Sequence, residues 1–185
     1  MIRVAAADDA AEIRRIYAPA VRQEVISFET VVPPERELQQ RVPTTLERFP
    51  WLVRVGDQGL LGFAYASSHR LRDAYRWSVE VSVYVDADCR RQGCGRQRIN
   101  RLFAILAAQG FYSAFAGIAV PNKTSQAFHE SLGFQQVGVF PGVAFKQGAW
   151  RDVGWWYRWL NDTWVSEPAV PSPFSQWLAA NLDCV

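Results

Sequence analysis

The chain has 185 residues, with 49% hydrophobic and 14% aromatic residues, which suits one globular domain with a sizeable core and excludes a disordered chain. Its formal net charge of +2 is too small to suggest a partner nucleic acid. No run approaches the roughly 18 apolar residues of a membrane span, and the N-terminus lacks a signal peptide's apolar core. The three cysteines (Cys89, Cys94 and Cys184) are odd in number and lack metal-ligand spacing, so we expect a cytoplasmic protein without a metal.

Strands and helices are predicted in turn over the first 66 residues. A short strand at 2–6 precedes a helix that Asp8 or Asp9 can cap. After an irregular stretch at 21–32, a second helix opens at Pro33-Pro34-Glu35 and ends before Pro50. Strands at 51–55 and 60–66 flank Gly56-Asp57-Gln58-Gly59, a strong hairpin signal.

The stretch at 78–101 combines a strand, a turn and a helix. Four valines lie on one face of the strand, and Ser78, Glu80, Ser82 and Tyr84 lie on the other. A turn at 86–90 leads into the basic sequence Arg91-Gln92-Gly93-Cys94-Gly95-Arg96. Apolar residues then recur at i, i+3, i+4 and i+7, which predicts a helix; they are Ile99, Leu102, Phe103 and Leu106.

The junction between this strand and this helix has the composition of an anion site. Gly93 and Gly95 let the backbone approach a phosphate, and Arg90, Arg91 and Arg96 supply positive charge. The first-turn amides of a helix have no internal partners, and the helix dipole adds positive charge there. An ordinary strand-to-helix connection with exposed arginines is the alternative.

The remaining elements complete a mixed α/β sheet with helices on both faces. A largely apolar strand at 111–120 precedes a short helix at 124–132. Two strands follow at 134–140 and 152–160, and a loop rich in glycine and aromatic residues is expected between them at 142–150. We divide the chain into a domain at 1–160 and a proline-containing C-terminal appendage at 161–185, in which Phe174, Trp177, Leu178 and Leu182 have helical spacing.

Two motifs in order resemble signatures of the GNAT acetyltransferase superfamily. Arg90-x-x-Gly93-x-Gly95 is similar to its pyrophosphate loop, and the segment from Asn122 to Leu132-Gly133-Phe134 is similar to its second signature. The resemblance narrows to phosphinothricin N-acetyltransferases and covers about residues 2 to 160. The segments that carry it are Pro50-Trp51-Leu52-Val53, Trp77-x-x-Glu80-x-Ser82-Val83-Tyr84-Val85, Ala108-Gln109-Gly110-Phe111 and Phe145-Lys146-x-Gly148-x-Trp150-x-Asp152-Val153-Gly154.

The resemblance implies a GNAT-like, mostly antiparallel sheet and a homodimer that uses acetyl-CoA. Members acetylate the α-amino group of phosphinothricin, methionine sulfoximine, methionine sulfone or arsinothricin. The matching positions assign acetyl-CoA to the backbone of Val83, Tyr84 and Val85, to the 90–96 loop (Arg90, Arg91, Gln92, Gly93, Cys94, Gly95 and Arg96) and to Asn122. Asn122 can equally be a helix cap, and both roles can coexist.

Glu80 and His129 are the candidate catalytic residues. Glu80 lies on the polar strand face at the family's glutamate position, where burial would raise its pKa toward the range useful for a base. The alternative is a structural ion pair with an arginine of the preceding loop. His129 lies where many GNAT enzymes have a tyrosine near the leaving sulfur, and a structural histidine is the alternative. His69 is treated as a loop residue.

Arg70 and Arg72 are the candidates for recognising an acidic substrate. A guanidinium matches an α-carboxylate with two hydrogen bonds, and a second arginine would serve a side-chain anion. A solvated basic loop is the alternative. The remaining substrate-binding candidates are Leu71, Ser82, Phe28 as a pocket wall, and Lys146 as a charge from this subunit or its dimer partner. Overall, the sequence predicts an acetyl-CoA-dependent N-acetyltransferase for an amino-acid analogue, with detoxification as its role; the alternatives are an enzyme for ordinary L-amino acids and a non-catalytic acetyl-CoA-binding regulator.

Overall fold

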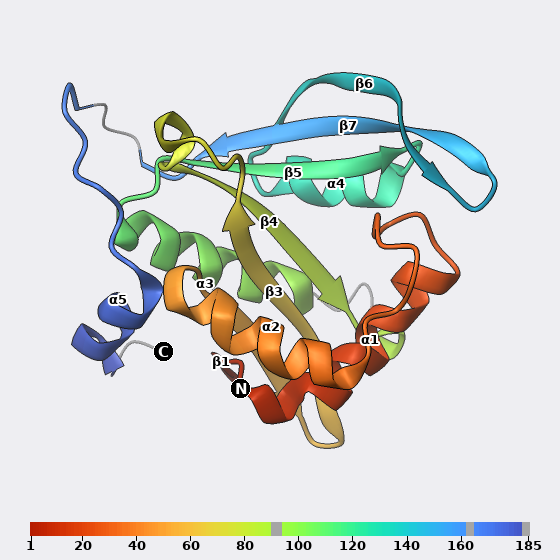
Figure 1. Ribbon diagram of the computed structural model, residues 1–185, viewed down its shortest axis with the longest axis horizontal. Coiled ribbons are helices and arrows are strands. Elements are labelled where there is room, and N and C mark those ends of the chain that lie inside the picture. The colour runs from red at the N-terminus through yellow and green to blue at the C-terminus, as the bar shows by residue number, and fades with distance from the viewer. Residues whose placement is uncertain (90–93, 162–164, 183–185) are drawn as a thin grey trace.

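A seven-stranded sheet runs through the protein in the order β1-β2-β3-β4-β5-β7-β6 (Figure 1). The computed structural model describes residues 1–89, 94–161 and 165–182. The strands are β1 (Ile2–Val4), β2 (Trp51–Gly56), β3 (Gly59–Ser68), β4 (Ser78–Val85), β5 (Ser113–Val120), β6 (Gln135–Lys146) and β7 (Ala149–Trp159). The helices are α1 (Ala10–Arg22), α2 (Glu35–Arg48), α3 (Cys94–Gln109), α4 (Lys123–Ser131) and α5 (Phe174–Ala180), with short 3₁₀ turns η1 (Ala7–Asp9), η2 (Asp73–Tyr75) and η3 (Ala87–Cys89).

The described strands pair antiparallel except at the centre of the sheet. There β4 pairs parallel with β5, but only through Ser78, Glu80 and the residue between them, opposite Ser113 to Phe115. Beyond these residues the two strands diverge toward their C-terminal ends (Figure 1). The predicted mostly antiparallel mixed sheet is therefore confirmed. At its centre, β4 and β5 are unpaired on the C-terminal side of Glu80.

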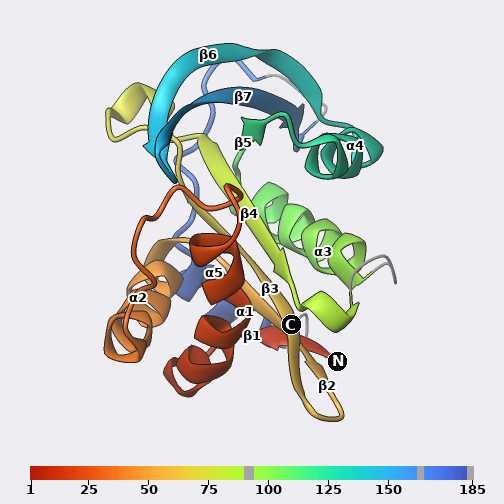
Figure 2. The same cartoon turned by 90° about the vertical axis from the view of Figure 1, so that its right-hand side faces the viewer.

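Helices cover both faces of the sheet. Helices α1 and α2 pack on one face with Trp51, Val53 and Phe63, and α3 packs on the other with Val79 and Val81 (Figure 2). The alternation of β4 explains this arrangement, because successive side chains point to opposite faces. Its valines enter the α3 side of the core, and Tyr84 packs on the α1 side.

The predicted loop at 142–150 is wrong in extent. Strand β6 continues to Lys146 and β7 begins at Ala149, so only Gln147 and Gly148 form the turn. Both turn residues have positive φ, 53° and 73°, which matches a tight two-residue hairpin. The glycine and aromatic content suggested a loop, but the aromatic residues are strand residues with high β propensity.

The C-terminal segment packs on the rest of the protein. Phe174 of α5 is fully buried in the same core cluster as Phe49 and Phe111. The hydroxyl of Ser175 also donates a hydrogen bond to the backbone oxygen of Glu47. The division of the chain into two parts at residue 160 stays a prediction. Among the described residues, no helix has the length and apolarity needed to cross a membrane.

Candidate active site

The divergence of β4 and β5 opens a cavity of about 1360 Å³. Its walls come from both strands, from α4 and from the connection between α1 and α2. Small-ligand pockets usually measure roughly 300–1,000 Å³, so this cavity has room for two substrates side by side.

The wall contributed by β4 has backbone groups without a strand partner. Val83, Tyr84 and Val85 line the cavity, and among the described strands none pairs with the β5-facing edge of β4 beyond Glu80. Free strand-edge amides and carbonyls bind an extended chain that carries amides of its own. The splayed edge required for the predicted cofactor role of these three residues is therefore present.

The start of α3 lies at the end of this edge. The helix begins at Cys94, so the first-turn amides of Cys94, Gly95 and Arg96 lack intrahelical acceptors. Arg96 lines the cavity, and its guanidinium donates to the carbonyl of Ser131 at the end of α4. Arg90, Arg91, Gln92 and Gly93 lie outside the described residues, so their phosphate-binding role stays a prediction.

Asn122 caps α4 and also lies on the cavity wall. Its Oδ1 accepts a hydrogen bond from the backbone nitrogen of Ser125 at 3.0 Å, which caps α4, and the residue lines the cavity. Because the cap uses the side-chain oxygen, the side-chain NH₂ group remains available to donate a hydrogen bond to a ligand.

Glu80 lies on the cavity wall at the point where the strands separate. Its side chain is 32% exposed, and burial raises the pKa of its carboxyl, while the positive charge of Arg70 acts in the opposite direction. Arg70 Nη1 is 3.4 Å from Glu80 Oε1, so the predicted ion pair is also present. A carboxylate with a raised pKa next to a ligand cavity is the electrostatic setting of a general base.

His69 does not line the cavity itself but contacts Glu80, which the sequence reasoning missed. Its Nδ1 is 3.1 Å from Glu80 Oε1, and its ring stacks on Phe115 at a centroid distance of 4.2 Å. Burial lowers the pKa of this histidine, and the charge of Arg70 lowers it further. The signal that could have found it is the antiparallel register of β3 and β4, in which Ser67 lies opposite Glu80 and places His69 diagonally across from it.

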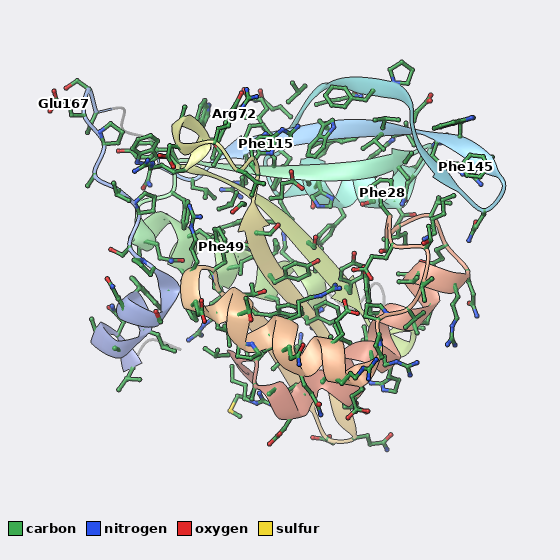
Figure 3. The ribbon with its side chains drawn as sticks, in the orientation of Figure 1. Phe28, Phe49, Arg72, Phe115, Phe145 and Glu167 are labelled. Carbon is green, nitrogen blue, oxygen red and sulfur yellow. The ribbon has the colours of Figure 1, made fainter. Side chains whose placement is uncertain are left out.

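The two arginines of the preceding loop lie in different places. Arg70 lines the cavity, and its guanidinium lies 5.5 Å from the ring centroid of Trp155. Leu71 is 95% exposed, and Arg72 is exposed at the start of η2; neither lines the cavity. Figure 3 shows Arg72 at the η2 end of the sheet, far from Phe28. The structure therefore brings only Arg70 to Glu80, because η2 turns the chain outward after it.

Of three further substrate-binding candidates, two line the cavity and one does not. Phe28 and Ser82 line the cavity, as predicted for a pocket wall. Lys146 does not; it is 5% exposed, and its ammonium donates to the backbone carbonyls of Ser27 and Ala20. Burial lowers the pKa of Lys146, with Glu29 opposing the shift. Within this subunit its ammonium therefore holds the α1–α2 connection and does not face the cavity, and a contribution across a dimer interface stays a prediction.

His129 lines the cavity, and one of its two ring nitrogens is bonded to the backbone of its own helix. Its Nδ1 donates to the backbone carbonyl of Ser125 at 2.8 Å, and its ring meets Phe128 and Phe134 edge to face. Burial lowers the pKa of this histidine, so the neutral ring keeps its proton on Nδ1 and offers Nε2 as an acceptor. This geometry supports the structural alternative.

Comparison with known proteins places this site in a family. Residues 2–155 match the model of the acetyltransferase (GNAT) domain. The chain is 35% identical to the phosphinothricin N-acetyltransferase of Streptomyces viridochromogenes, over 93% of this chain and 91% of that one. It is 38% identical to the enzyme of the same name from Alcaligenes faecalis, over 90% and 86% of the two chains.

The chain belongs to the phosphinothricin N-acetyltransferase family of GNAT enzymes. Its fold agrees: the crystal structure of a phosphinothricin acetyltransferase from Sinorhizobium meliloti in complex with acetyl-CoA superposes with a TM-score of 0.85, at 33% identity over 91% of this chain and 92% of that one. An L-methionine sulfoximine/L-methionine sulfone acetyltransferase from Salmonella typhimurium is 33% identical over 82% of this chain and 90% of that one. This GNAT chain is therefore an acetyl-transferring enzyme.

Proposed function

We propose that this enzyme transfers the acetyl group of acetyl-CoA to the α-amino group of a glutamate-like or methionine-derived amino-acid analogue. The observation that carries the proposal is the position of Glu80, a carboxylate with a raised pKa at the mouth of the opening between β4 and β5. Arg70 lies beside it on the same cavity wall. The proposal thus places a base for the amine next to a cation for the carboxylate of an amino acid.

The reaction forms an N–C bond and breaks the C–S bond of the thioester. A substrate amine is an ammonium ion at neutral pH, and only its deprotonated form has a lone pair for attack. Glu80 would accept that proton, and the burial of its carboxyl makes it a stronger base than an exposed glutamate. The attacking nitrogen loses a second proton as the amide forms, and the departing thiolate would take up that proton to leave as CoA–SH. His129 is not assigned as a donor, because its Nδ1–H is bonded to Ser125.

Acetyl-CoA fits the described cavity on chemical grounds. The unpaired edge of β4 suits the amides of its pantetheine arm, and the first-turn amides of α3, which lack intrahelical acceptors, suit its pyrophosphate. Asn122 can donate from the opposite wall. The acetyl-CoA complex of the Sinorhizobium relative supports this assignment.

The acceptor side of the cavity supports an amino acid. We assign the α-carboxylate to Arg70, with Phe28 and Ser82 as further wall contacts. The proposal includes a detoxifying role, which the substrates named for the relatives support: phosphinothricin and methionine sulfoximine or sulfone. Ordinary L-amino acids are the second candidate, because a relative from Escherichia coli, 33% identical over 82% of this chain and 89% of that one, is named L-amino acid N-acyltransferase.

A homodimer is part of the proposal. Strand β6 is at the edge of the sheet, and the β6–β7 hairpin exposes large apolar side chains, a composition typical of subunit interfaces. They are Val137, Val139, Phe140, Val143, Phe145 and Trp150. Figure 3 shows Phe145 on this hairpin, at one end of the molecule.

A turnover assay tests the proposal. Purified enzyme is mixed with acetyl-CoA and a panel of acceptors, and release of CoA thiol is followed. The panel contains phosphinothricin, methionine sulfoximine, methionine sulfone, arsinothricin, glutamate and methionine. We expect turnover with the analogues to exceed that with glutamate and methionine. Equal or faster turnover of glutamate and methionine would favour the second candidate, and acetyl-CoA binding without turnover on any acceptor would indicate a regulator.

A further inference from the structure

We propose that His69 is a positioning residue for Glu80, and that its Nδ1–H fixes Oε1 so that Oε2 is the oxygen that takes the proton from the acceptor amine. This inference rests on the proposed role of Glu80 as the base. His69 Nδ1 lies 3.1 Å from Oε1, and among the described residues no hydrogen bond reaches Oε2. A base held by one oxygen presents the other in a fixed direction, which is what proton transfer within hydrogen-bonding distance requires.

The ring of His69 is held in place by aromatic neighbours. It stacks on Phe115 of β5 with an interplanar angle of 11°, and the edge-to-face contact with Trp155 of β7 has a centroid distance of 5.7 Å. Only 12% of its side chain is exposed. A donor that cannot rotate away loses little entropy on holding the carboxylate, so its hydrogen bond persists through the catalytic cycle.

Arg70 cannot replace His69 in this role. Its Nη1 donates to the carbonyl of His69 at 2.8 Å and lies 3.4 Å from Oε1, so the histidine makes the closer contact with Glu80. Arg70 is also the group assigned to the substrate carboxylate, and a second carboxylate would compete with Glu80 for the same guanidinium. His69 would then remain the holder of Oε1.

The surroundings keep this donor neutral. The charged and titratable groups facing the pair are Arg70 and Tyr75 on the β3–β4 connection and Tyr65 on β3, and Phe115 and Trp155 add none. Burial and the charge of Arg70 lower the pKa of His69. A neutral donor orients a carboxylate without the full positive charge that would depress its basicity.

Three substitutions of His69 separate the hydrogen bond from the ring. His69→Asn has an N–H near the position of Nδ1 but no ring. His69→Leu has nearly the same shape as the asparagine variant but lacks the N–H donor. His69→Phe retains the ring without the donor. The assay measures kcat/KM against pH with acetyl-CoA and the panel acceptor that the wild type acetylates fastest.

We expect His69→Leu and His69→Phe to lower kcat/KM by about 10- to 100-fold, the effect of losing a hydrogen bond to a charged group. Losing a donor to the charged form raises the pKa of Glu80, so the acidic limb of the profile should move to higher pH in both variants. His69→Asn should stay within about threefold of the wild type, with an acidic limb near its original pH. In a Glu80→Gln background, His69→Leu should cost little more, because the group through which it acts is already gone.

The opposite results would overturn the inference. Equal losses in His69→Asn and His69→Leu, or an unmoved acidic limb in His69→Leu, would reduce His69 to a packing residue, and this comparison stands even if His69→Phe does not fold. If Glu80→Gln alone retained wild-type turnover, the base assignment itself would fail, which is a separate outcome from failure of His69 alone.

Discussion

Glu80 is a carboxylate on the polar face of a central strand, where solvation is incomplete. Burial makes the charged form less favourable and raises its pKa, which is the property a general base needs and a structural ion pair does not. His69 and Arg70 share one of its oxygens. The ion pair with Arg70, first considered as an alternative to catalysis, thus coexists with the catalytic assignment.

Replacing Glu80 with glutamine should lower kcat by about 10²-fold or more, the usual scale for a lost general base. The amide has nearly the same shape, so acetyl-CoA affinity should stay unchanged. The wild type should also lose kcat/KM as pH falls through the raised pKa of Glu80, since protonation removes the base, and the variant should lack that limb. A variant with the wild-type rate and acidic limb would make Glu80 structural.

Arg70 and Arg72 provide a matched pair from one loop. Arg70→Ala should lower kcat/KM by about 10- to 100-fold on every amino-acid acceptor, because the α-carboxylate is common to all of them. Arg72 lies outside the cavity, so Arg72→Ala should act only through long-range attraction of an anionic side chain. We expect a smaller loss on phosphinothricin and a change below about threefold on the uncharged side chain of methionine sulfone.

The comparison requires kcat/KM for both variants on both acceptors at two salt concentrations. The effect of Arg72→Ala should shrink as salt rises, since screening weakens long-range attraction. A loss in Arg72→Ala that equals or exceeds the loss in Arg70→Ala on phosphinothricin would show that Arg72 contacts the substrate directly.

At the scale of elements, β4 and α3 together make one binding surface. The alternating sequence of β4 puts valines into the core and Glu80, Ser82 and Tyr84 on the other face. Its final residues diverge from β5, and α3 begins at Cys94 shortly afterwards. The same short stretch therefore supplies the proposed base, an unpaired strand edge and a helix N-terminus.

Gly95 tests the helix N-terminus as the phosphate site. Acetyl-CoA should raise the melting temperature of the wild type, because a ligand of the native state shifts unfolding by mass action. Gly95→Asp should abolish this rise by opposing the pyrophosphate with a carboxylate. Gly95→Ala, the matched neutral control, should preserve a larger rise than the aspartate variant. An acidic residue in the first turn suits the helix dipole, so the aspartate variant should still fold, and a wild-type thermal response from it would refute the site.

Local patterns in the sequence predicted most of the elements correctly. The alternation at 78–85, the 56–59 turn and the helix between Pro33 and Pro50 depend on neighbouring residues, and all three are confirmed. The 142–150 loop was predicted wrongly because composition alone does not distinguish an aromatic loop from a hairpin with a two-residue turn.

The site was predictable only where a motif or one strand face defined it. Glu80, Ser82 and Asn122 lie at the cavity as expected. The contact of His69 with Glu80 was missed because it depends on the pairing of β3 with β4. The bond of Lys146 to the carbonyl of Ser27 was missed because the two residues are 119 positions apart and meet only in the folded chain. Arg72 follows Arg70 by two residues, yet the chain turns outward into η2 and separates their positions. The spacing of residues in a loop does not predict which of them face the same cavity.

At the scale of the whole molecule, the candidate active-site cavity lies between two halves of one sheet. Strands β1 to β4 form one half and β5 to β7 the other, joined at the short parallel contact between Ser78–Glu80 and Ser113–Phe115 (Figure 1). Glu80, the proposed base, is at the last joined position, so under this proposal the geometry of the whole sheet determines where acetyl transfer occurs. The proposed function requires this cavity to acetylate the α-nitrogen of an amino-acid analogue.

Identification of the product tests that claim most directly. The wild type and Glu80→Gln are incubated with acetyl-CoA and phosphinothricin, and in parallel with methionine sulfone, and the products are analysed by mass spectrometry and NMR. We expect the wild type to produce an analogue carrying one acetyl group on its α-nitrogen, with one CoA released per product, and Glu80→Gln to form it far more slowly. Wild-type enzyme that leaves both analogues unmodified while acetylating another amine would contradict the claim.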